Sequence, residues 1–126
     1  MSGVPPTPTR RRAVRIGRMA RHHSPPEKTP DGHFVVIDGR RWRATDPDVP
    51  EDIAARLRRH LMSARRAVRS ALDAGDSEAE SAARGRVQRA KVALGERGTP
   101  WWEQPGEERR RRWEEGLAHL DADSPD

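Results

Sequence analysis

The fold is decided by residues 51–96, which read EDIAARLRRHLMSARRAVRSALDAGDSEAESAARGRVQRAKVALGE. Small and apolar side chains recur at spacings of three and four in both halves of this stretch, a pattern typical of a helix that packs against another helix. The recurring residues are Ala54, Leu57, Leu61, Ala64, Val68, Ala71, Ala83, Val87, Ala90 and Leu94. The stretch therefore predicts two amphipathic helices that share one seam.

A short break separates the two predicted helices. Gly75 suits a left-handed C-cap, and Asp76 suits the N-cap of the next helix. Because the connection is so short, the helices should be antiparallel neighbours. Their alanine-rich seam buries little apolar area, so we expect further cover from a β-hairpin, from tryptophans or from a second copy of the chain. Gly85, in the middle of the second helix, indicates a close contact.

A β-hairpin is predicted before the helices. Residues 34–37 and 40–44 flank Asp38-Gly39, a dipeptide that favours a two-residue type I′ turn. This turn pairs Ile37 with Arg40 and Val35 with Trp42. Val35, Ile37 and Trp42 should then share one face and pack on the rest of the protein. The opposite face carries Phe34, Val36, Arg41 and Arg43.

Three further signals complete the fold. Asp48, with Glu51 three residues later, predicts a capping box at the start of the first helix. At least one of Trp101 and Trp102 should fold back over the end of the helical pair or onto the β-hairpin. Residues 107–120 predict a short third helix, in which glutamates pair with the run Arg109–Arg112 and leave it solvated.

Together these signals predict a mainly α protein with an N-terminal β-hairpin packed on an antiparallel two-helix hairpin, plus a short C-terminal helix. We expect a disordered, basic, proline-rich tail over residues 1–32, the domain itself over 33–104, and a short helix with a frayed end over 105–126. Structural or interaction roles are expected for Trp42, Trp101, Trp102, Leu57, Leu61, Val68, Val87 and Leu94.

Composition excludes several functions. The chain of 126 residues has no cysteine, which excludes disulfides, thiolate nucleophiles and cysteine-based zinc sites. It has no apolar run long enough for a membrane span and no secretory segment, so the prediction is a cytoplasmic protein without a membrane partner. The net charge of +5 lies within residues 1–18, and an alternative start at Met19 would remove it.

The sequence offers no recognisable catalytic constellation. It lacks a nucleophile elbow and a glycine-rich nucleotide loop, and His22-His23 have no further metal ligand at a suitable spacing. We therefore predict no enzymatic activity, no cofactor, no metal and no small-molecule substrate.

Two functions stay open. The first is a protein-interaction or adaptor module that forms a homo-oligomer through its alanine-rich hairpin or binds another protein. The alternative is a small nucleic-acid-binding protein, in which arginines contact phosphates and Trp42 stacks on a base. Its binding residues would be Arg10, Arg11, Arg12, Arg15, Arg18, Arg40, Arg41 and Arg43. A hairpin with a solvated arginine face and Trp42 in the core would explain Arg40–Arg43 without any ligand.

Three segments also carry a family resemblance. They are DGHFVVIDGRRWRATDP at 31–47, ARRAV at 64–68 and RGRVQRAKVALGERGTPWWE at 84–103. In these segments the chain resembles small, mostly actinobacterial proteins commonly labelled "biopolymer transporter Tol". The resemblance implies no established activity and no functional residues. The chain does not support a transporter function, because it has neither an apolar anchor nor repeated propeller blades.

Overall fold

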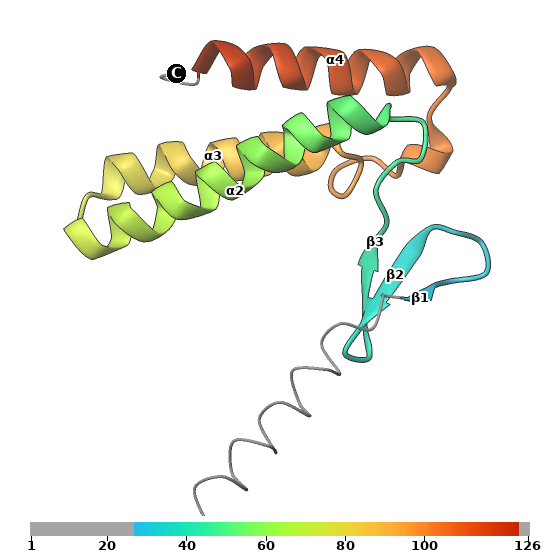
Figure 1. Ribbon diagram of the computed structural model, residues 1–126, viewed down its shortest axis with the longest axis horizontal. Helices are drawn as coiled ribbons and strands as arrows, with labels where there is room; N and C mark the ends of the chain where they lie inside the picture. Colours follow the sequence, from blue (N-terminus) through green and yellow to red (C-terminus); the bar gives the residue numbers. More distant parts are fainter. Residues whose placement is uncertain (1–26, 124–126) are drawn as a thin grey trace, which may run out of the picture.

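The computed structural model describes residues 27–123, in which three helices form a body and a small sheet extends from one end of it (Figure 1). The predicted mainly α fold is confirmed. The elements are β1 (Glu27–Lys28), β2 (Phe34–Ile37), β3 (Arg40–Arg43), α2 (Glu51–Ala74), α3 (Ser77–Ala93), the short 3-10 helix η1 (Trp101–Glu103) and α4 (Gly106–Asp123). Residues 1–26, with the arginines at positions 10–18 and the predicted tail up to that point, lie outside the described residues.

Helices α2 and α3 form the predicted antiparallel hairpin. Gly75 ends α2 in the left-handed region with a φ of 68°, and the Asp76 side chain caps α3 by accepting from the backbone N–H of Ala79. The alanines and leucines of the predicted seam are buried, whereas Val68 and Val87 are half-buried. The periodicity of the sequence therefore identified the correct faces.

The start of α2 differs from the prediction. Its N-cap residue is Pro50, which makes no side-chain cap hydrogen bond, so the capping box built on Asp48 is wrong. The backbone N–H of Asp48 instead donates to Asp46 Oδ1 at 2.9 Å. The Asp48 carboxylate lies 3.1 Å from Arg109 on α4. A partner distant in sequence therefore replaces the expected local cap.

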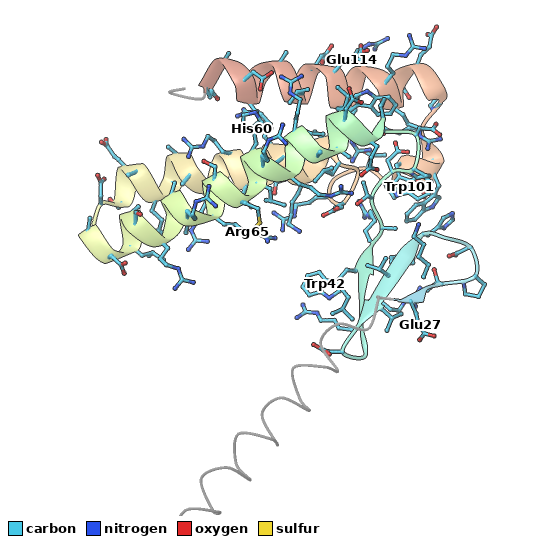
Figure 2. The ribbon with its side chains drawn as sticks, viewed as in Figure 1. Glu27, Trp42, His60, Arg65, Trp101 and Glu114 are labelled. Atoms are coloured by element: carbon cyan, nitrogen blue, oxygen red, sulfur yellow. The ribbon has the colours of Figure 1, made fainter. Side chains whose placement is uncertain are left out.

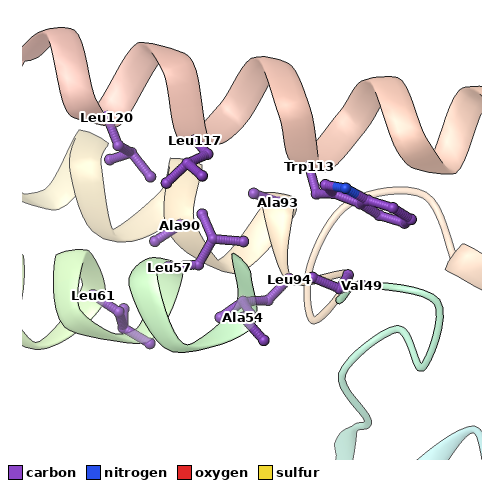
Figure 3. Close-up of a cluster of buried hydrophobic side chains, with 10 residues drawn as sticks. All are labelled: Val49, Ala54, Leu57, Leu61, Ala90, Ala93, Leu94, Trp113, Leu117 and Leu120. Carbon is purple, nitrogen blue, oxygen red and sulfur yellow. The ribbon is translucent and has the colours of Figure 1, made fainter. Parts of the chain in front are cut away.

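Helix α4 supplies the cover that the alanine-rich seam needs. Trp113, Leu117 and Leu120 project from it into the core, where they meet Leu57 of α2 and Leu94 at the end of α3 (Figure 3). The remaining members of this core are Val49, Ala54, Leu61, Ala90 and Ala93. The seam is therefore completed within one chain at this end of the hairpin.

The close helix contact occurs at Gly116 on α4. A Cβ built on Gly116 would lie 2.7 Å from the Cβ of Ala93, so only glycine fits without a shift of the backbone. The close contact predicted at Gly85 is wrong, because a Cβ built there meets nothing within 4 Å.

The sheet has the strand order β1-β2-β3, with all neighbours antiparallel. The predicted register is confirmed: Ile37 pairs with Arg40 and Val35 with Trp42. Asp38 and Gly39 both have positive φ, at 53° and 78°, as a type I′ turn requires. Strand β1 begins at Glu27, six residues before the expected domain boundary at residue 33.

The position of Trp42 contradicts its expected place in the core. Trp42 and Ile37 are each 43% exposed, because the sheet meets the helical body at its end and not across its face (Figure 1). Within residues 27–123, no helix is both long and apolar enough to span a membrane.

Candidate interaction surfaces

A buried ion pair joins the segment after β3 to α4. Asp46, in the segment between β3 and α2, is only 2% exposed. Arg109 of α4 donates to both of its carboxylate oxygens, at 3.1 Å and 2.5 Å. The hydrogen bond to Asp46 raises the pKa of Arg109. The backbone N–H of Asp46 also donates to the carbonyl of Leu94, so one residue joins the strand, α3 and α4.

Arg112 provides a second link between α4 and the end of α3. Its guanidinium donates to the carbonyls of Val92 and Arg97, at 2.8 Å and 2.5 Å, and to the side chain of Gln104. Burial lowers the pKa of Arg112, and the charge of Arg43 acts in the same direction. The predicted solvated arginine run is therefore wrong for Arg109 and Arg112, and none of its expected pairs with neighbouring glutamates is present among the described residues.

An aromatic cluster joins the sheet to the helical body. Trp101 is buried and its Nε1 donates to the carbonyl of Ala44 at 3.0 Å. Trp102 stacks on His33, with ring centroids 3.9 Å apart, and meets Phe34 edge to face. Both tryptophans therefore fold back, as predicted, but they cover the sheet end of the body and not the helical seam.

The first candidate surface is a groove at the far end of the helical hairpin. Figure 1 shows α4 stopping short of the α2–α3 turn. Beyond that point the groove between α2 and α3 is open, with a volume of about 530 Å3. Its lining is almost entirely small side chains with one charge at each end: Ala67, Ser70, Ala71, Ala74, Asp76, Ala79, Ala82, Ala83 and Arg86. We call this surface the distal groove.

The distal groove continues the face on which α4 lies. On α2, Arg56 and His60 contact Asp121 of α4, and Ala67, Ala71 and Ala74 follow them at helical spacing on the same side. The groove is therefore a helix-binding face of which α4 occupies only the part near the core.

The second candidate surface is a crevice between the sheet and the helices, with a volume of about 320 Å3. Figure 2 shows Trp42 on the sheet and Arg65 on α2 at its two sides. The complete lining is Val35, Ile37, Trp42, Arg43, Ala44, Thr45, Arg65, Lys91 and Glu96. We call this surface the sheet crevice. Sequence reasoning identified Trp42 and Arg43 but missed Arg65, Lys91 and Glu96, because no local pattern places them opposite a strand.

The arginines of β3 already contact aromatic rings of this chain. Arg40 lies over Trp42, with 4.4 Å from its guanidinium carbon to the ring centroid. Arg41 lies over Phe34 at 4.5 Å, and Arg43 over Trp102 at 5.8 Å. Of the arginines proposed to contact nucleic acid, these three are the ones that the structure describes.

Within residues 27–123, no group of three or more histidine, aspartate or glutamate side chains is arranged to hold a metal ion. His60, beside the seam of α2, lies 2.7 Å from Asp121 of α4 and so has a structural partner. Comparison of the chain with family models, with curated proteins and with solved structures found no match.

Proposed function

We propose that this chain is a non-enzymatic, cytoplasmic protein-interaction module that self-associates through the distal groove. The observation that carries the proposal is that α4 covers the α2–α3 face only near the core, while the same face continues as an open groove lined by alanines. Alanine side chains let a second helix approach closely, so the groove suits another helical hairpin.

The charges at the ends of the distal groove favour a second copy as the occupant. Asp76 and Arg86 both line the groove on the α3 side and are ten residues apart. In a dimer with a two-fold axis, each contact occurs twice: if a residue of the first copy contacts a second residue in the other copy, the same contact is repeated with the copies exchanged. Two antiparallel α3 helices would therefore place Asp76 of each copy beside Arg86 of the other and form two ion pairs.

Light scattering coupled to size-exclusion chromatography tests the proposal. At tens of micromolar the wild-type protein should have a mass of twice the 14.2 kDa of one chain. Ala82→Arg puts a long charged side chain into the groove and should give the monomer. Because Ala82 is an exposed helical position and arginine is a good helix former, this variant should keep its fold, which circular dichroism checks.

Ser81→Arg is the matched control. Ser81 is exposed on the same helix but does not line the groove, so this variant should remain a dimer. A wild-type protein that stays monomeric at tens of micromolar would overturn the proposal. So would a dimer that both variants leave intact.

A further inference from the structure

The edge of β3 that faces away from β2 carries backbone N–H and C=O groups that bond to no other strand of the described sheet. The backbone N–H of Ala44 donates to the carbonyl of His33, which makes these residues a hydrogen-bonded pair. Such pairs alternate along an antiparallel ladder, so Trp42 and Arg40 also bond to β2. Arg41 and Arg43 consequently direct their backbone N–H and C=O groups away from β2. Among the strands within residues 27–123, the order β1-β2-β3 leaves this edge of the sheet unpaired.

This edge opens beside the sheet crevice, which provides an apolar wall next to the free backbone groups. Val35, Ile37 and Trp42 form the wall, and the last two are each 43% exposed. An added strand would place every second side chain on this face of the sheet. Those side chains would pack against Trp42 and be partly buried. A strand bound at this edge would therefore make both backbone hydrogen bonds and apolar contacts.

The charge around the edge is strongly positive. Arg40, Arg41, Arg43, Arg65 and Lys91 lie along β3 or in the crevice wall. The carboxylate in the crevice lining is Glu96, which pairs with Lys91 at 3.6 Å and accepts from Thr45 at 2.7 Å. Within residues 27–123, Arg65 has no hydrogen bond or ion pair with another side chain, so its charge is available to a ligand.

Charge also argues against a second copy at this edge. Two β3 strands paired with each other would bring arginines opposite arginines, and like charges facing each other destabilise a sheet. A strand with acidic side chains would instead meet Arg41 and Arg43. The edge therefore resists self-pairing but complements an acidic partner.

The competing ligand is a single-stranded nucleic acid. Bases stack on exposed aromatic faces, and here Arg40 covers one face of Trp42, Arg41 lies over Phe34 and His33 stacks on Trp102, which reduces the aromatic area open to bases. In addition, the unpaired N–H and C=O groups alternate as a peptide backbone requires. These two observations favour a peptide.

We propose that the edge of β3 binds an extended acidic peptide as a fourth strand of the sheet. Acidic side chains at alternate positions would face Arg41 and Arg43, and apolar side chains between them would lie against Trp42 in the sheet crevice. This mode of recognition takes its affinity from backbone hydrogen bonds and its specificity from alternate side chains. The surface is separate from the distal groove, so it extends the proposed function to a second partner.

Fluorescence anisotropy with the full chain tests the proposal. The probe is a fluorescein-labelled eight-residue peptide that alternates glutamate and valine, and its control alternates lysine and valine. The glutamate peptide should bind saturably and the lysine peptide should not. Trp42→Ala should weaken binding about tenfold, the equivalent of losing one well-buried contact. Arg41→Glu should abolish binding, whereas Arg59→Glu, at an exposed site on α2 that does not line the crevice, should leave it unchanged.

A backbone-modified peptide separates strand addition from simple charge attraction. N-methylation of the peptide groups that would donate to Arg41 and Arg43 preserves every charge but removes the ladder hydrogen bonds, so binding should be lost. Equal binding of the methylated peptide would overturn the proposal, as would no binding of the unmodified one.

The same assay with a twelve-nucleotide single-stranded RNA addresses the competing ligand. Tighter binding of the RNA than of the peptide, lost in Arg41→Glu, would replace the proposal with nucleic-acid recognition. All measurements are repeated in Ala82→Arg, so that failure of peptide binding is distinguished from failure of self-association.

Discussion

Gly116 lies where α4 approaches α3, and a Cβ built there would be 2.7 Å from the Cβ of Ala93. Gly85 lies within α3 at an exposed position where an added Cβ would meet nothing within 4 Å. Alanine favours a helix over glycine at both sites by about 1 kcal/mol. Whether alanine stabilises the protein at each site therefore depends on the space around the glycine.

Alanine substitutions at these glycines should have opposite effects. Gly116→Ala should lower the free energy of unfolding by about 1–2 kcal/mol, because Ala93 can yield only through a backbone shift. Gly85→Ala should raise it by up to about 1 kcal/mol. Urea denaturation followed by circular dichroism measures both changes. If both substitutions changed the free energy of unfolding in the same direction, the close contact between Gly116 of α4 and Ala93 of α3 would be contradicted.

The four tryptophans also show that surroundings decide the role of a residue. Trp113 and Trp101 are buried, Trp102 stacks on His33, and Trp42 is 43% exposed. Trp113 meets the helical core and Trp101 bonds to a backbone carbonyl. Trp42 is therefore the tryptophan best placed to meet a ligand.

At the scale of the elements, α4 is held at both ends by charged groups and in the middle by apolar ones. Arg109 and Arg112 attach its first half to the segment after β3 and to the end of α3. Asp121 near its C-terminal end contacts Arg56 and His60 of α2. These contacts fix α4 against the near half of the hairpin and so determine where the distal groove begins.

Neighbouring arginines of α4 should differ sharply in their contribution to stability. Arg109→Ala leaves the buried Asp46 carboxylate without its partner, which should lower the free energy of unfolding by about 3 kcal/mol. Arg110→Ala alters an exposed side chain and should change it by less than about 0.5 kcal/mol. Thermal and urea denaturation compare the two variants. Equal losses would mean that the arginine run acts only through helix propensity and surface charge.

At the scale of the whole molecule, the sheet and the helical body meet through a small contact. It includes the stack of His33 and the edge of Phe34 on Trp102, the hydrogen bond from Trp101 to the carbonyl of Ala44, and a hydrogen bond of 2.5 Å from Arg43 to the carbonyl of Gly98. The helices have their own core, to which the described strands contribute no residue. The orientation of the sheet, and with it the width of the sheet crevice, therefore depends on a few side chains.

Loss of the His33–Trp102 stack should loosen the sheet without unfolding the helices. In Trp102→Ala, amide hydrogen exchange of residues 33–44 should accelerate, while that of α2, α3 and α4 should stay as in the wild type. Arg59→Ala, at an exposed site on α2 away from this contact, is the control and should change neither. Accelerated exchange throughout the helices of Trp102→Ala would show that sheet and body form one cooperative unit.

The sequence by itself determined the features that depend on neighbours along the chain. The Asp38-Gly39 turn sets the strand register, Gly75 and Asp76 end one helix and begin the next, and the spacing of Leu57 and Leu61 identifies a buried face. Each of these rests on local backbone geometry or on the period of an element. A single sequence is enough to predict these features, because they do not depend on residues distant in the chain.

Only the tertiary structure decided which distant groups meet. Local sequence patterns predicted Trp42 in the core and Asp48 as the cap of α2. In the structure Trp42 is exposed, α2 has no side-chain cap, and Arg109 of α4 binds Asp46. The structure also showed that α4 covers one half of the helical seam and leaves the distal groove open. These outcomes depend on how whole elements fit together, because a charged or aromatic side chain can be stabilised by water or by a distant partner, and its sequence neighbours do not distinguish the two.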